Sequence, residues 1–134
     1  MANEELSQLR YLQEIYGERY ALINQEIKNR MGYLQELNNV SVSVNSLPEI
    51  AGKPTLNPIG ADLYLFGTAS REQKIIVGVG GGYLVEKSAD EAKEFLSKVL
   101  SKHEKAVSEL MKEKETLENA MLEITYRIAS AEGE

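Results

Sequence analysis

The sequence predicts an α+β fold in which a long antiparallel two-helix coiled coil is joined by two β-hairpins. Two observations support this prediction. Heptad-patterned segments of nearly equal length occupy the two ends of the chain. Between them, residues 55–87 contain Pro58 and six glycines, which repeatedly weaken a helix. A block of short strands that joins two such helices folds them back on each other.

Composition limits the class of protein. With 134 residues, the chain has the length of one domain, and we assign 1–134 to a single domain. The net charge of −6, with both signs interspersed, argues against nucleic acid and anionic membranes as partners. The absence of cysteine excludes disulfides and thiolate zinc sites. No apolar run has the length of a membrane span, and the first residues lack signal-peptide character, so we expect a soluble, cytoplasmic protein.

The first predicted helix spans residues 3–46, with Asn3 as a plausible N-cap. Its apolar positions recur at alternating spacings of four and three, the pattern of a coiled-coil seam. The seam positions are Leu9, Tyr16, Tyr20, Ile23, Ile27, Arg30, Leu34, Leu37, Ser41 and Val44. Residues 40–44 alternate with period two and are compatible with a strand. We favour helix because they continue the heptad phase and precede Pro48.

The predicted β region covers residues 55–87 and follows a connector, residues 47–54, that contains two prolines and a glycine. Three short segments are rich in β-branched and aromatic residues, which is typical of strands. These segments are Leu63–Phe66, Ile75–Val79 and Tyr83–Val85. The polar residues 68–72 suit a hairpin connection between the first two of them.

The second predicted helix spans residues 89–130 and begins with a capping box, in which Ser88 is followed three residues later by Glu91. Its seam consists of Leu96, Leu100, His103, Val107, Leu110, Lys114, Leu117, Met121, Ile124 and Ile128. Antiparallel pairing of the two helices should place His103 near Arg30.

Catalytic chemistry is not indicated. No nucleophile, base and orienting group converge in the sequence, so we expect neither an enzyme nor a bound cofactor. The run Gly78–Gly82 invites comparison with a phosphate loop, but it lacks the P-loop lysine and is followed by a strand. A nucleotide-binding domain remains an alternative that measurable ATP or NAD binding would establish. His103, the only histidine, is interpreted as a register-fixing seam residue, with a metal ligand as the alternative.

Apolar residues also occur off the seam near both chain ends. They are Tyr11, Leu12, Ile15, Leu122 and Tyr126. One interpretation is scattered surface hydrophobes or a wider groove between the helices. The other is an exposed tip that binds apolar segments of other proteins.

The order helix, two hairpins, helix resembles the α class of prefoldin subunits. The segment Leu56–Ala61 is similar to the family's first-strand motif, and Val79–Ala92 is similar to its last strands and second helix start. Asn57 replaces an apolar residue of the family pattern, and Asp62 stands where a small residue is common.

The resemblance implies a chaperone subunit of a hetero-hexamer, with two α-type and four β-type prefoldin subunits. The strands would assemble into an oligomeric β-barrel. The coiled-coil tips would hold unfolded client proteins for a group II chaperonin. A self-assembling structural or filament protein that needs no β-type partner is the competing interpretation.

Two sets of residues follow as candidates for these roles. The expected client-binding residues at the coiled-coil tips are Leu6, Leu9, Leu12, Ile15, Tyr16, Met121, Leu122, Ile124, Tyr126 and Ile128. The expected oligomerisation residues are Ile59, Leu63, Leu65, Phe66, Ile75, Val77, Val79, Tyr83 and Val85.

Overall fold

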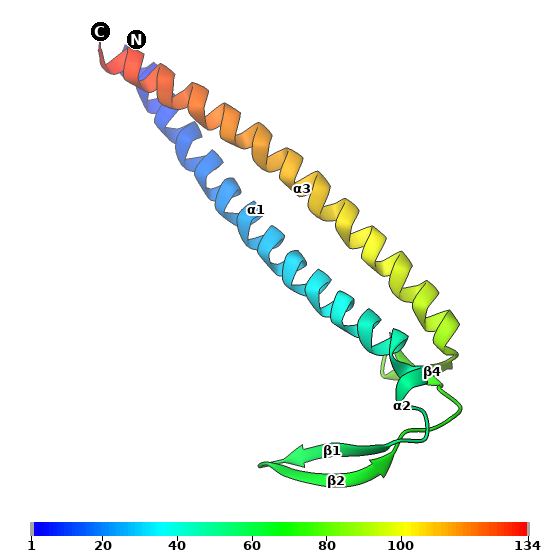
Figure 1. The fold of residues 1–134 in the computed structure, drawn as a ribbon. Coiled ribbons are helices and arrows are strands. Elements are labelled where there is room, and N and C mark those ends of the chain that lie inside the picture. Colours follow the sequence, from blue (N-terminus) through cyan, green and yellow to red (C-terminus); the bar gives the residue numbers. More distant parts are fainter. Residues whose placement is uncertain (1, 134) are drawn as a thin grey trace. The chain divides into compact units, whose positions relative to one another are not determined.

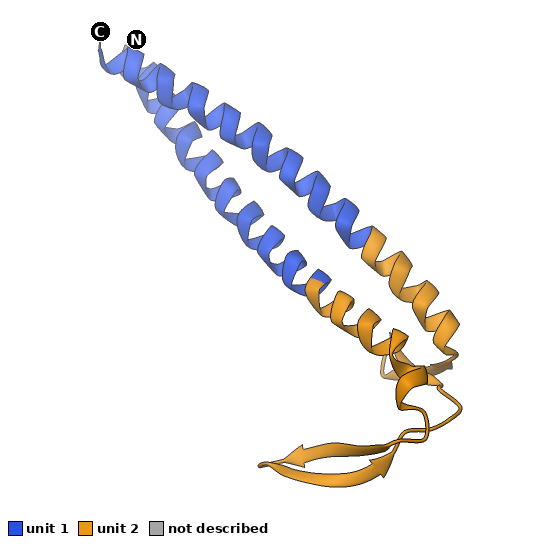
Figure 2. Cartoon of the chain, in the orientation of Figure 1, with its two compact units in different colours: residues 1–34, 102–134 blue, residues 35–101 orange. Residues whose placement is uncertain are grey.

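The computed structural model describes residues 2–133 and confirms the predicted α+β class (Figure 1). The elements, in chain order, are α1 (Ala2–Asn45), α2 (Leu47–Ile50), β1 (Pro54–Gly60), β2 (Leu63–Thr68), β3 (Ile75–Gly80), β4 (Tyr83–Lys87) and α3 (Ala89–Glu132). They belong to two compact units (Figure 2). The arm unit takes the chain up to Leu34 and again from Lys102, and the hairpin unit spans Gln35–Ser101.

In the arm unit, α1 and α3 run antiparallel. Arg10 contacts Glu132, Arg19 contacts Glu113, and Arg30 contacts His103, so partner numbers on α3 fall as those on α1 rise. Every seam position predicted in this unit is buried or half-buried. The buried ones are Leu9, Ile23, Val107 and Ile124. The heptad pattern therefore identified the packed face of both helices, because apolar side chains at these spacings share one helix face.

The hairpin unit has a core of its own. Leu37 and Val44 of α1 pack with Leu96 of α3, and half-buried residues surround them. The surrounding residues are Leu47, Ile75, Val99 and Leu100. Residues 40–44 are helical, as predicted, and Val44 is part of this core.

The strands form two separate two-stranded antiparallel sheets, β1 with β2 and β3 with β4. The expected hairpin connection at residues 68–72 is therefore wrong, since it links two sheets. The true turns are Ala61-Asp62, with φ of 48° and 59°, and Gly81-Gly82, with φ of 60° and 78°. Positive φ at both central residues is the type I′ geometry that matches the twist of paired strands.

The predicted helix start is confirmed for α3, and the predicted N-cap is wrong for α1. The capping box at the start of α3 is confirmed: the Glu91 amide donates to Ser88 Oγ at 3.1 Å, and Ser88 Oγ donates to the Glu91 carboxylate at 3.0 Å. The N-cap assignment of Asn3 is wrong, because α1 already includes Ala2. The connector at residues 47–54 contains the short helix α2, with Pro48 in its first turn, where a missing N–H costs little.

Candidate interaction surfaces

A polar layer interrupts the apolar seam of the arm unit. Arg30 Nη1 lies 3.2 Å from His103 Nδ1, and the Tyr33 ring meets the His103 ring edge-on at a centroid distance of 4.8 Å. Because a guanidinium only donates, Nδ1 must accept, and the imidazole proton resides on Nε2. The Arg30 side chain also forms a 3.6 Å ion pair with Glu26. The contact of His103 with Arg30 joins the two helices across the seam, as the register interpretation expects.

Four cations occur in the terminal half of the arm unit, defined as residues 2–20 with 113–133. Each one already has a partner within the chain. Arg10 binds Glu132 at 2.6 Å, Arg19 binds Glu113 at 2.7 Å, and Arg127 binds Glu123 at 2.7 Å. Lys114 Nζ lies 5.7 Å from the centroid of the Tyr20 ring. All four cations of this region therefore have a partner, and some of its glutamates have no cation beside them.

The ten expected client-binding residues divide into two groups. Six are buried or half-buried, namely Leu6 and the five seam residues Leu9, Tyr16, Met121, Ile124 and Ile128. Four are exposed: Leu12, Ile15, Leu122 and Tyr126, the last two at 70% and 74% of their full accessible area. Only the exposed group can meet another protein without opening the coil.

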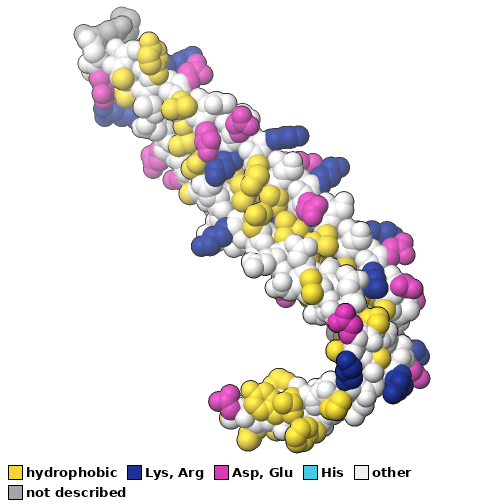
Figure 3. All heavy atoms as spheres, viewed as in Figure 1, with side chains coloured by type: hydrophobic (Ala, Val, Ile, Leu, Met, Phe, Trp, Pro, Cys, Tyr) yellow, Lys and Arg dark blue, Asp and Glu magenta, His cyan; other side chains and the backbone are white. Residues whose placement is uncertain are grey.

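Further exposed apolar side chains lie outside the expected set. Tyr11 was noted as off the seam, and its side chain is 65% exposed. Leu22, Met31 and Met111 are also exposed, and the sequence analysis did not single them out. The heptad pattern could have identified them, because each lies outside the a and d positions that form the seam. Figure 3 shows hydrophobic side chains continuing along the visible face of the helices, between charged ones.

The hairpin β1–β2 exposes apolar side chains on both of its faces. Cross-strand pairing puts Leu56 opposite Phe66 on one face, where Phe66 is 89% exposed. Ile59, Leu63 and Leu65 are exposed as well. Hydrophobic side chains accordingly cluster over this hairpin in Figure 3. An exposed apolar patch of this kind is typical of an interaction surface.

The hairpin β3–β4 has one face against the chain itself. Ile75 is half-buried and packs on the core of the hairpin unit. Val77 is half-buried, opposite Val85. The remaining expected residues of this hairpin, Val79 and Tyr83, are exposed. The other face presents Ile76 and Leu84, which the sequence analysis did not select although strand alternation points to them.

An open apolar groove lies beside β3. It has a volume of about 290 Å³ and is lined mainly by α1, and also by Leu47 and Ile75. The α1 residues are Glu36, Asn39, Val40, Ser43 and Val44. Together with the exposed hairpin faces, the groove makes the hairpin unit a surface suited to contact with another protein.

The family model for prefoldin subunits matches residues 16–133. The chain belongs to the prefoldin family. A Pyrococcus horikoshii protein named prefoldin subunit alpha is 34% identical over 107 residues, which cover 78% of this chain and 72% of that relative. A Thermofilum pendens protein of the same name is 32% identical over 77 residues, covering 57% and 60%.

The fold is also similar to that of a prefoldin solved by cryo-EM. A filamentous PFD from Methanocaldococcus jannaschii matches with a TM-score of 0.54 and 22% identity, over 87% of this chain and 92% of that chain. At this identity the likeness establishes the prefoldin fold. Within residues 2–133, none of the helices combines the length and the apolarity required to cross a membrane.

Proposed function

We propose that this chain is an α-type prefoldin subunit that joins β-type subunits through its hairpins and holds non-native proteins with its helical arms. The hetero-hexamer of two α-type and four β-type subunits, and transfer of clients to a group II chaperonin, belong to the same proposal. It needs no catalysis and no cofactor, because capture and release depend on many weak contacts.

The observation that most supports the proposal is the exposure of apolar side chains on both hairpins. A two-stranded sheet is only marginally stable by itself in water, and it leaves strand edges unpaired. Leu56, Phe66, Ile76 and Leu84 would all lose contact with water if hairpins from several subunits completed one barrel. The relatives named prefoldin subunit alpha support the assignment to the α class.

A separate observation supports client binding on the arm unit. Leu12, Ile15, Leu122 and Tyr126 are exposed there, although a two-helix coil does not require apolar residues at those positions. The terminal turns of two long paired helices also have few neighbours and open readily. Extended apolar segments of a non-native protein would therefore find both exposed and transiently opened apolar surface.

A double substitution tests the assembly step. The variant Ile76→Glu/Leu84→Glu alters the exposed face of β3–β4 and leaves Ile75 in its core position. We expect it to remain helical by circular dichroism but to stop co-eluting with a β-type prefoldin subunit in light-scattering chromatography. Ser97→Glu/Ser101→Glu adds the same charge on exposed positions of α3 and should assemble normally.

Aggregation of a thermally unfolding enzyme tests the chaperone step. The assembled protein should suppress light scattering, and the subunit mixture containing the Ile76→Glu/Leu84→Glu variant should protect much less. Full oligomers of that variant would contradict hairpin-mediated assembly. A large particle formed by the wild-type chain alone, unchanged by a β-type subunit, would instead favour the self-assembling alternative.

A further inference from the structure

The terminal half of the arm unit is strongly acidic. It contains nine glutamates and four lysines or arginines, a difference of −5. The rest of the arm unit, residues 21–34 with 102–112, contains three glutamates and five lysines or arginines. The excess negative charge is therefore concentrated in the same half that exposes Tyr11, Ile15, Leu122 and Tyr126.

Two of these glutamates stand next to each other on the outer face of α1. Glu14 and Glu18 are four residues apart, and both are exposed. Like charges at this spacing destabilise a helix by about 0.2–0.5 kcal/mol. Neighbouring cations do not relieve this repulsion, because Arg10 is directed to Glu132 and Arg19 to Glu113.

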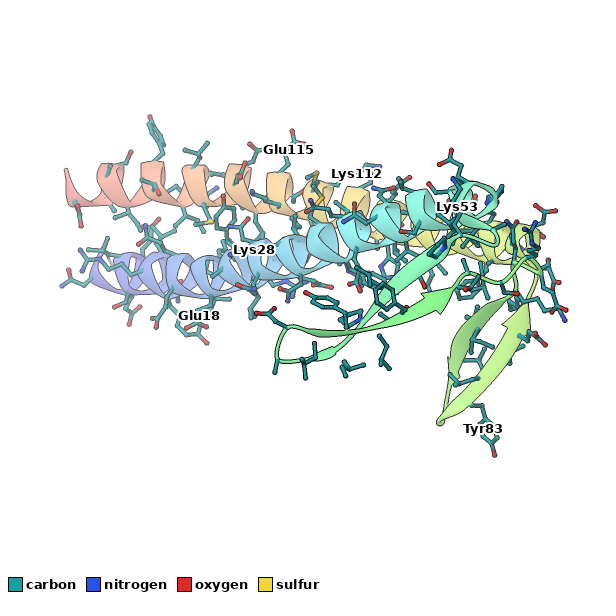
Figure 4. All side chains as sticks on the ribbon, turned by 60° about the horizontal axis from the view of Figure 1, so that its bottom comes forward. Glu18, Lys28, Lys53, Tyr83, Lys112 and Glu115 are labelled. Atoms are coloured by element: carbon teal, nitrogen blue, oxygen red, sulfur yellow. The ribbon has the colours of Figure 1, made fainter. Side chains whose placement is uncertain are left out.

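Most other glutamates in this region have local explanations. Glu4 and Glu5 lie in the first turn of α1, where the helix dipole favours negative charge. Glu118 accepts a 2.9 Å hydrogen bond from the Tyr20 hydroxyl. Among the described residues, Glu14, Glu18 and Glu115 have neither an ion pair nor a helix terminus beside them, and Glu14 and Glu18 share one face of α1. In Figure 4, Glu18 points away from α3 into solvent.

The same outer face of α1 is apolar between these carboxylates. Tyr11, Ile15 and Leu22 are exposed and follow one another at spacings of four and seven, which keeps them on one side of the helix. Glu14 and Glu18 fall within this run. We call these five residues the outer stripe. Apolar side chains supply contact area without selectivity, and the alternating carboxylates add a preference for positive charge.

We propose that the outer stripe binds apolar polypeptide segments that carry lysine or arginine between their apolar residues. The inference rests on the proposed function, because it names the class of client segment that the arm prefers. Tyr11, Ile15 and Leu22 would contact the apolar residues of the client, and Glu14 and Glu18 would pair with its cations. Since these carboxylates are exposed, each pair contributes modestly and is weakened by salt.

Fluorescence anisotropy with matched peptides tests the preference. The probes are peptides of identical length and apolar content with lysine, serine or glutamate at the polar positions, and the protein is the full chain assembled with a β-type subunit. We expect the affinity order lysine, serine, glutamate. The substitution Glu14→Gln/Glu18→Gln should reduce the preference for the lysine peptide over the serine peptide by about two- to tenfold.

Two control variants make the result specific. Glu104→Gln/Glu109→Gln removes the same charge from exposed positions outside the outer stripe and should leave the preference unchanged. Tyr11→Ser/Leu22→Ser should weaken binding of the lysine and serine peptides together, because it removes the shared apolar contacts. High salt should bring the two affinities closer, since the Debye length falls to about 3 Å at 1 M.

The outcomes separate this inference from the proposed function. If Glu14→Gln/Glu18→Gln leaves the peptide preference intact, or if the control pair lowers it equally, the outer stripe does not select cationic segments and the inference is overturned. The chaperone proposal still stands in that case, provided that the serine peptide binds and the client enzyme is protected. Absence of binding to all peptides, with unprotected client, overturns both.

Discussion

At the scale of single residues, a polar pair interrupts the apolar seam of the arm unit. His103 and Arg30 occupy positions that apolar residues would fill in a uniform coiled coil, and they hydrogen-bond to each other instead. A polar pair in a seam lowers stability but disfavours other alignments of the helices, because misaligned partners leave it unsatisfied. The sequence predicted this proximity, since the alignment of two regular helices follows from their lengths and their heptad phase.

Replacing the pair with leucine should strengthen the arm. His103→Leu alone should have a small effect, because the gain in apolar packing is offset by an Arg30 side chain that loses its acceptor. Arg30→Leu/His103→Leu should raise the free energy of unfolding by about 1–3 kcal/mol, as two half-buried polar side chains give way to apolar ones. Thermal and urea unfolding followed by circular dichroism measures this. A lower stability in the double variant would show that the polar pair itself stabilises the arm.

At the scale of elements, helices and strands differed in how far the sequence determined them. Every seam position that the heptad pattern predicted in α1 and α3 is buried or half-buried, since a helix repeats the same local geometry along its length, although the buried Ala92 lies outside the predicted seam. The pairing of the strands was predicted incorrectly at residues 68–72. The sequence Gly81-Gly82 is a recognised signal for a type I′ turn. The sequence Ala61-Asp62 is not such a signal, because alanine rarely adopts the positive φ that it has here.

The candidate surfaces were predictable only in part. Exposed off-seam residues such as Tyr126 followed from the heptad phase alone. The packing of Ile75 on the helices did not follow from the sequence, because it depends on which face of β3 turns toward them. The ion pairs Arg10–Glu132 and Arg19–Glu113 join residues distant in sequence, so the unpaired state of Glu14 and Glu18 emerges only in the folded arm.

The start of α3 offers a test of one element. Ser88→Ala removes the side-chain oxygen that accepts from the Glu91 amide, and it should cost about 1 kcal/mol. The loss should be local, with faster hydrogen exchange in the first turn of α3. Ser101→Ala, at an exposed position within α3, should be neutral or slightly stabilising. Equal effects of the two substitutions would mean that the capping box contributes nothing beyond helix propensity.

At the scale of the whole molecule, the two compact units suit two different tasks. The hairpin unit has a core of its own and exposes apolar strand faces, whereas the arm unit is held by a narrow seam and a few ion pairs. A chaperone subunit needs this division, because assembly must be stable while client contacts must remain weak and reversible. Shortening the arm unit should therefore affect clients without affecting assembly.

Two shortened chains distinguish the position of client binding from arm length. Deleting residues 1–12 and 122–134 removes Tyr11, Leu12, Leu122 and Tyr126, all exposed apolar residues. Full burial of one such side chain contributes about 1.5–3 kcal/mol, so we expect at least about tenfold weaker client binding with assembly unchanged. Deleting residues 23–29 and 104–110 instead removes one heptad from each helix and keeps the seam in phase.

The second deletion retains the terminal halves of both helices, so the chain should still hold clients. Chromatography with a β-type subunit checks assembly of both shortened chains, and light scattering of an unfolding enzyme measures protection. If the chain without 1–12 and 122–134 protects as well as the intact chain, the exposed terminal residues are not the binding surface. Client contacts would then lie elsewhere on this subunit, where Ile15 and Leu22 of the outer stripe are retained, or on its β-type partners.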